Sequence, residues 1–195
     1  VYDSRGYNVR RDWVNGPNSV FRAVLGGFFD MNFSADYDAF YFMEIDAVPL
    51  KPDWTSQLIA EAFYYPSAAI RGSRYRGDGW DAFIEQMPQD LLVHINGNAI
   101  YNLEHDWTHF IYDAIVSADS LSTLMEEMAF DVAFAKVTMD AMSGADATFA
   151  TAWASAGGTN MTYYAETMLI GNYANTLLNT SFEAGTYIFH GSRKN

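Results

Sequence analysis

The chain has 195 residues, of which 50% are hydrophobic, 16% aromatic and 18% charged, and its net charge is −13. This length and composition are typical of a globular chain with a hydrophobic core rather than a disordered one. A strongly negative chain repels phosphate backbones, which excludes nucleic acid as a partner, and an anionic substrate would need a bound cation. The absence of cysteine excludes disulfides and thiolate metal sites.

Asn32, Asn160 and Asn179 each begin an N-x-S/T sequon. These sequons favour the secretory pathway, in the Golgi or ER lumen, or an extracellular location, and they leave a cytoplasmic one open. No apolar run approaches the roughly 20 residues of a membrane span. The chain begins with valine, and we interpret it as a piece of a longer polypeptide or assembly.

The first part of the chain reads as a helix, a strand and a second helix. Apolar residues at helical spacing predict a helix over residues 19–26, ended by two glycines. A short aromatic run predicts a buried strand over residues 39–44. Asp53 is predicted to cap the helix that follows, and a short strand then leads into a loop containing Arg71.

The second part of the chain continues the alternation. A strand ending in a Gly-Asn turn is predicted within residues 91–102, followed by helices over 104–117 and 124–143, a loop over 144–159 and a last strand over 185–191. Because strands alternate with helices, we expect a single α/β domain with a mainly parallel central sheet flanked by helices.

Glu44 and Asp46 leave the predicted buried strand as a pair, separated only by Ile45. In open α/β sheets, ligands bind at the carboxyl ends of strands, and two carboxylates there repel unless a cation lies between them. Mg²⁺ and Mn²⁺ prefer oxygen ligands, so the pair predicts a divalent cation site. Strand alternation would direct Ile45 into the packed layer. The alternative is a solvated strand end.

This stretch, "EIDAVPLKPDW", resembles the metal-binding D-x-D region of GT-A fold glycosyltransferases, with Glu44 in place of the first acid. The resemblance implies a Rossmann-like fold, a nucleotide-sugar donor and an Mn²⁺ or Mg²⁺ ion held on its diphosphate. It also implies that the first strand or strands of the family fold, with part of the base pocket, are missing from this chain.

Further matches follow in the family's order. "HINGNAIYN" is similar to the glycine-containing turn that the family places beside the donor sugar and the acceptor, which implies donor or acceptor binding by Asn96, Gly97 and Asn98. Amide side chains suit sugar hydroxyls because they both donate and accept. The alternative is an ordinary Asn-Gly turn.

The resemblance implies that Asp131, in "FDVAF", is the base that takes the acceptor proton, with inversion at the sugar carbon. Glu126 and Glu127 are rivals for this role, and a retaining mechanism stays open. The alternative is that these acids face solvent or stabilise the positive end of a helix.

Near the end of the chain, "GTYIFHGSRKN" places His190 where the family often supplies a further metal ligand. Ser192, Arg193 and Lys194 could then meet the diphosphate, and Arg71 begins a loop that would help to choose donor and acceptor. The alternative is a strand-end histidine with a solvated basic tail.

Two further interpretations compete with this one. His105 and His109 imitate the zinc helix H-E-x-x-H, although Asp106 replaces its glutamate and no third ligand stands out. The resemblance itself predicts a glycosyltransferase acting on a glycan, protein or lipid acceptor. It also allows a GT-A-like structural or interaction domain without catalysis, or a sugar-binding module.

Overall fold

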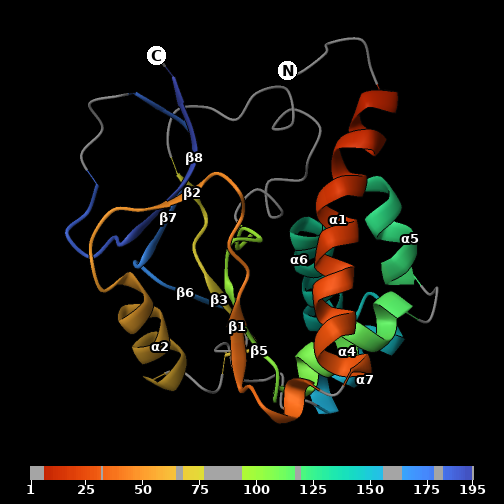
Figure 1. The fold of residues 1–195 in the computed structure, drawn as a ribbon. Coiled ribbons are helices and arrows are strands. Elements are labelled where there is room, and N and C mark those ends of the chain that lie inside the picture. Colours follow the sequence, from red (N-terminus) through yellow and green to blue (C-terminus); the bar gives the residue numbers. More distant parts are fainter. Residues whose placement is uncertain are drawn as a thin grey trace. The chain divides into compact units, whose positions relative to one another are not determined.

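A computed structural model describes residues 7–31, 33–64, 68–76, 94–116, 120–155, 164–177 and 182–194. The chain divides into two compact units. One comprises Val1–Asp38 and Asp106–Thr159, and its described elements are helices. The other comprises Ala39–His105 and Asn160–Asn195, and it contains every described strand together with one helix (Figure 1).

The helical unit has an aromatic core. Its elements are α1 (Tyr7–Asp30), the 3-10 helix η1 (Phe33–Ala35), α4 (Asp106–Val116), α5 (Ser120–Glu127), α6 (Phe130–Ser143) and α7 (Ala147–Ser155). Phe21 of α1 is fully buried and stacks on Phe130 of α6, with ring centroids 4.1 Å apart. The ring of Trp107 in α4 meets Trp153 of α7 edge-on at 5.0 Å. Aromatic pairs in these geometries add to the free energy gained from burial alone.

Helix α1 is longer than the sequence predicted. The two glycines that were expected to end it, Gly26 and Gly27, lie inside the helix, which continues to Asp30. Each costs roughly 1 kcal/mol of helix propensity. Burial of Phe21 and Leu25 on one stripe outweighs that cost, because tertiary packing supplies most of the stability of a helix in a protein.

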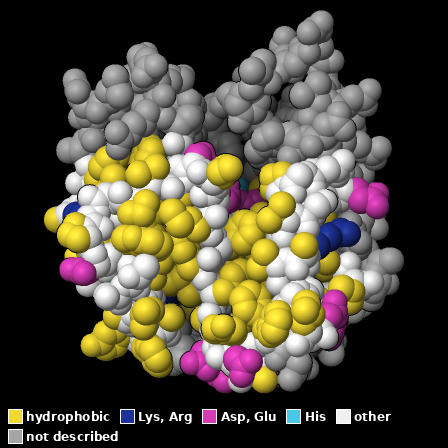
Figure 2. Space-filling model, viewed as in Figure 1, with side chains coloured by type: hydrophobic (Ala, Val, Ile, Leu, Met, Phe, Trp, Pro, Cys, Tyr) yellow, Lys and Arg dark blue, Asp and Glu magenta, His cyan; other side chains and the backbone are white. Residues whose placement is uncertain are grey.

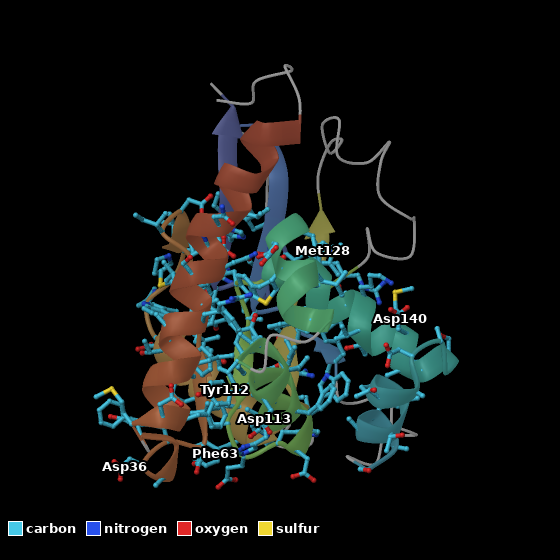
Figure 3. The ribbon with its side chains drawn as sticks, turned by 90° about the vertical axis from the view of Figure 1, so that its right-hand side faces the viewer. Asp36, Phe63, Tyr112, Asp113, Met128 and Asp140 are labelled. Carbon is cyan, nitrogen blue, oxygen red and sulfur yellow. The ribbon has the colours of Figure 1, made fainter. Side chains whose placement is uncertain are left out.

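The single helix predicted over residues 124–143 is wrong, because two helices, α5 and α6, meet at Met128 (Figure 3). Asn18 of α1 stabilises the break and is 4% exposed. Its Nδ2 donates to the carbonyl oxygens of Met125 and Met128, at 2.6 and 3.0 Å, and its Oδ1 accepts from the Phe130 amide at 2.8 Å. One side chain thus caps the end of α5 and the start of α6, whose N-cap residue Ala129 makes no side-chain cap.

We therefore expect Asn18→Ala to lower the free energy of unfolding by about 1–3 kcal/mol, because buried backbone groups lose their partners. Urea denaturation followed by circular dichroism measures this change. Asn15→Ala, on an exposed face of the same helix, is the matched control and should change stability little. Equal stability of the two variants would contradict the capping role.

Helix α7 replaces the loop predicted over residues 144–159. The small residues there suggested a loop, but Ala is the best helix former, and residues 147–155 fold as a helix that buries Trp153. The turn before α7 does need a glycine, because Gly144 ends α6 in the left-handed conformation, with φ 70°.

The second unit holds two small mixed sheets (Figure 1). The first has the order β1 (Ala39–Tyr41), β5 (Ile100–Asn102), β3 (Ile70–Gly72), β6 (Tyr164–Glu166). The second has the order β2 (Ala47–Pro49), β8 (Ile188–Lys194), β7 (Ile170–Leu177), β4 (Tyr75–Arg76). The pairs β1–β5, β3–β5 and β2–β8 are antiparallel, and β3–β6, β7–β8 and β4–β7 are parallel.

The protein is thus α/β, but the expected mainly parallel central sheet is wrong. In the sequence, predicted strands alternate with predicted helices, and this order suggested helical crossover connections between parallel strands. Among the residues that the structure describes, helices α4 to α7 follow one another without an intervening strand, and β7 is followed by β8 without a helix. Local pattern gives each element its type, whereas the pairing direction depends on partners far away in the chain.

Helix α2 (Trp54–Tyr64) packs on the second unit's apolar core, which contains Leu58, Ile170 and Ile188. Asp53 precedes the helix as predicted, with φ 62°, and its carbonyl accepts the first helical bond from Gln57. The opposite face of α2 exposes Ile59, Phe63 and Tyr64. Figure 2 shows hydrophobic side chains on the surface in the region where α2 lies in Figure 1. Ile59 is 58% exposed. Among the described helices, none has the length and apolarity that a bilayer span requires.

Candidate metal centre

Glu44 and Asp46 lie in a tight turn between β1 and β2. The predicted strand over residues 39–44 ends as regular structure at Tyr41, and the Glu44 carbonyl accepts from the Ala47 amide at 3.0 Å. This four-residue turn has Ile45 and Asp46 at its centre. The expectation that Ile45 points into the packed layer is wrong, because Ile45 is fully exposed. Turn geometry, rather than strand alternation, brings the two acids to one side.

The pairing of β2 with β8 brings His190 to these acids. Ala47, next to Asp46, lies directly opposite His190 in the antiparallel register. His190 was predicted at the end of its strand, and it lies inside β8, where it is 3% exposed. Its Nε2 is 3.1 Å from Glu44 Oε2 and 3.1 Å from Asp46 Oδ1. The three residues therefore converge from opposite ends of the unit's sequence.

The arrangement fits a divalent cation. In an octahedral site with bonds of about 2.1 Å, adjacent ligand atoms lie about 3.0 Å apart and opposite ones about 4.2 Å apart. The ligand atoms of Glu44, Asp46 and His190 all lie within 4.8 Å of one another. Two carboxylates and an imidazole are a donor set that suits Mn²⁺. The side chain of Asp46 is 54% exposed and that of Glu44 30%, so the cluster opens to solvent and leaves room for water or substrate oxygens.

Without a cation, the two carboxylates favour the protonated form of His190. Burial lowers the pKa of His190, but hydrogen bonds to Asp46 and Glu44 and their negative charges outweigh it and raise this pKa to about 9. The hydrogen bond from His190 in turn lowers the pKa of Asp46. A cation that enters the cluster must therefore displace a proton from His190 Nε2 over much of the neutral range.

This cluster should make the stability of the metal-free chain depend on pH. The pKa of His190 is about 9 in the folded state against 6.5 for an unperturbed histidine, so its contribution is complete below pH 6.5 and is lost as pH rises through 9. We expect the free energy of unfolding in EDTA to fall over this interval. In His190→Gln the fall should be smaller, as measured by urea denaturation at several pH values. Identical pH profiles would contradict the shift.

Sequence reasoning missed Asn172. It lies beside His190 in the parallel register of β7 and β8, is fully buried, and its Oδ1 lies 2.9 Å from His190 Nδ1. Its Nδ2 donates to the carbonyl oxygen and the hydroxyl of Ser73, at 2.7 and 2.8 Å. The one available signal was an asparagine within an apolar strand, since a buried amide needs partners.

The Asn96–Gly97–Asn98 turn lies beside the acidic turn but is buried. Asn98 is 0% exposed, and its Oδ1 accepts from the Tyr41 hydroxyl at 2.6 Å and from the Glu44 amide at 3.4 Å. Asn96 is 3% exposed, and its Oδ1 accepts from the Asn98 amide at 3.0 Å. Among the described residues, Asn98 Nδ2 is a buried donor that has no hydrogen-bond partner. This turn therefore supports the acidic turn from behind, and its one unsatisfied donor is the buried Asn98 Nδ2.

Of the basic residues that were predicted to bind donor or acceptor, the structure describes the side chain of Arg71 and not those of Arg193 and Lys194. Arg71 lies in β3 rather than a loop, and its guanidinium pairs with Glu61 of α2. Lys194 ends β8 opposite Leu177, and the side chains of Ser192, Arg193 and Lys194 lie outside the described residues. Their contact with a diphosphate stays a prediction.

Asp131 belongs to the helical unit, where it lies in the first turn of α6, is buried, and accepts from the Val132 amide at 2.9 Å. This position agrees with the helix-end alternative, and its role as a base stays a prediction. Glu126 is exposed on α5, and the side chain of Glu127 lies outside the described residues.

The zinc-helix alternative finds no support among the described residues, because α4 begins at Asp106, one residue after His105, and neither histidine belongs to a group with metal-ligand geometry. His109 packs its ring on Phe29, with centroids 4.8 Å apart. Within the described part of the chain, the cluster of Glu44, Asp46 and His190 is the group found with metal-ligand geometry.

Comparisons of the chain with protein-family models, with curated proteins and with solved structures found no match.

Proposed function

We propose that this chain is a metal-dependent glycosyltransferase, which moves a sugar from a nucleotide-sugar donor to an acceptor hydroxyl. The convergence of Glu44, Asp46 and His190 on one point is the observation that carries this proposal. The residues of the acidic motif and the late histidine are distant in sequence, and the resemblance to the family calls for them at one cation.

The three side chains would hold Mn²⁺ or Mg²⁺ through carboxylate oxygens and imidazole Nε2. The bound cation would supply positive charge to the departing nucleoside diphosphate. A chain with net charge −13 needs such a cation to accept an anionic donor, because its own field repels one. The exposed side of Asp46 leaves the cluster accessible to that donor.

Asn98 supports the sugar-binding part of the proposal. A buried amide donor without a partner is costly, and a ligand hydroxyl or phosphate oxygen would satisfy it. The Oδ1 of the same amide group accepts from the Glu44 backbone, so this donor lies close to the acidic turn. The acceptor base that the resemblance implies is Asp131, and its part in the reaction is a further prediction.

The test is nucleotide release from uridine and guanosine diphosphate sugars, with and without an acceptor, in Mn²⁺ and in EDTA. We expect turnover that requires the metal and is lost in Asp46→Ala. Full turnover in EDTA or in Asp46→Ala would exclude the metal mechanism. If the chain binds neither Mn²⁺ nor a nucleotide-sugar, it is a non-catalytic structural or interaction domain. If it binds glycans with indifference to nucleotide, it is a sugar-binding module.

Asn98→Asp gives a sharper test of the sugar contact, because it keeps the oxygen that accepts from Tyr41 and removes the amide donor. We expect weaker donor binding, by about tenfold for one lost hydrogen bond, without a loss of Mn²⁺ affinity, because the substitution adds a negative charge beside the acidic turn. Isothermal titration calorimetry measures both affinities. Unchanged donor affinity in this variant would remove Asn98 from the sugar site.

A further inference from the structure

We infer that Asn172 is a positioning residue of the metal centre, which holds the His190 ring with a hydrogen on Nδ1 and turns Nε2 toward Glu44 and Asp46. This inference rests on the proposed metal site and adds a residue that neither the motif nor the resemblance indicated. Metal-bound histidines usually donate their second ring nitrogen to such a partner, which fixes the ring and its tautomer.

The hydrogen bonds of Asn172 determine its own orientation. The backbone carbonyl of Ser73 can only accept, so the Asn172 atom 2.7 Å away must be the donor Nδ2. The other amide atom is then Oδ1, which can only accept. Since Oδ1 lies 2.9 Å from His190 Nδ1, that nitrogen must carry the hydrogen. In the neutral ring the lone pair is therefore on Nε2, the atom that faces the two carboxylates.

The sheet keeps this contact rigid. Asn172 and His190 lie opposite each other in the parallel pair β7–β8, so their side chains lie on the same face. Both side chains are at least 96% buried, and little space is left for an alternative rotamer. A buried partner that is fixed by sheet register pre-organises a ligand better than a loop residue would.

Asn172 also connects the two sides of the centre. The Ser73 carbonyl that accepts from Asn172 accepts as well from the Asn96 amide, at 3.0 Å. Asn96 bonds Asn98, and Asn98 accepts from the Glu44 amide. A series of hydrogen bonds thus runs from His190 through Asn172 to the acidic turn, and its last bond, to the Glu44 amide, is longer, at 3.4 Å, and part-buried. It fixes the imidazole relative to the carboxylate that must share its cation.

The experiment measures Mn²⁺ affinity by calorimetry in variants of the whole chain, with fold checked by circular dichroism. We expect Asn172→Leu to weaken Mn²⁺ binding by about 10–100-fold, the usual effect of losing an outer partner of a metal-ligating histidine. Asn172→Asp keeps an acceptor for Nδ1 and should stay within about threefold of the parent chain. Ser73→Ala removes the hydroxyl that accepts from Asn172 but keeps the carbonyl that fixes its orientation, so affinity should fall less than in Asn172→Leu.

A second measurement does not depend on metal and remains decisive if Asn172→Leu does not fold. In the metal-free chain labelled with ¹⁵N-histidine, two-bond ¹H–¹⁵N correlation at alkaline pH reports which ring nitrogen of His190 carries the hydrogen. We expect hydrogen on Nδ1 in the parent chain. Hydrogen on Nε2, or parental Mn²⁺ affinity in a folded Asn172→Leu, would overturn the inference. Failure of the parent chain to bind Mn²⁺ would instead overturn the proposed function, while the tautomer would still be tested.

Discussion

In Asp46→Asn and in His190→Ala, we expect the affinity for Mn²⁺ to fall by more than about 100-fold, beyond the effect of losing an outer partner. The asparagine of Asp46→Asn has nearly the same shape as aspartate but removes a full negative charge from the cluster. Because Asp46 is exposed, the variant should fold as the parent chain does. His190→Ala removes the nitrogen that lies 3.1 Å from both carboxylates and leaves them to repel each other. Calorimetric titration of Mn²⁺ into the metal-free chain measures both affinities.

The control must separate a specific site from general attraction, because a chain of net charge −13 collects cations nonspecifically. Glu104→Gln removes one exposed negative charge from the same unit, away from the cluster, and should leave Mn²⁺ affinity unchanged. Repeating the titration at higher ionic strength weakens nonspecific attraction more than coordination. Equal losses of Mn²⁺ affinity in Glu104→Gln and Asp46→Asn would show that the cluster is not a specific metal site.

The second large effect is expected at Gly72, where β3 passes close to the turn that holds Asn96 and Asn98. A Cβ at Gly72 would lie 2.6 Å from Ile95 Cγ2 and 2.7 Å from Ala99 Cβ, well inside contact distance. Gly72 also accepts from the Thr167 amide at 2.6 Å, so its strand is held on both sides. Gly72→Ala should lower the free energy of unfolding by about 1–3 kcal/mol, since overpacking forces backbone shifts.

The same substitution should also weaken Mn²⁺ binding, because Ile95 and Ala99 flank the asparagines that support Glu44. Gly27→Ala is the matched control, since a Cβ at Gly27 meets nothing within 4 Å and the residue lies in helix α1. There alanine should stabilise the chain by roughly 0.5–1 kcal/mol. Urea denaturation and Mn²⁺ titration compare the two variants. A Gly72→Ala chain as stable as the parent would contradict the close packing described at β3.

Local sequence patterns indicated several elements well. Helix α4, the helix that follows Asp53 and the strand that carries His190 were all expected near their observed positions. Each depends on residues a few positions apart, so the pattern is visible without the fold. The pair of acids before β2 was visible for the same reason, because the turn that groups them spans only Glu44 to Ala47.

Other features depended on distant partners and could not be predicted. The break between α5 and α6 requires Asn18, which is more than 100 residues away in the sequence. The exposure of Ile45 followed from a turn where the pattern indicated a strand. The direction of strand pairing likewise depends on which strands meet, and β7 and β8 pair in parallel without a described helix between them.

The sequence by itself therefore determined the residue types of this protein's candidate centre, namely two acids at a turn and a late histidine. Only the tertiary structure brought them together, because the register of β2 with β8 puts Ala47 opposite His190. It also supplied Asn172, whose contact with the imidazole exists only through the register of β7 with β8. Sheet register is a property of distant backbone hydrogen bonds, and no short stretch of sequence encodes it.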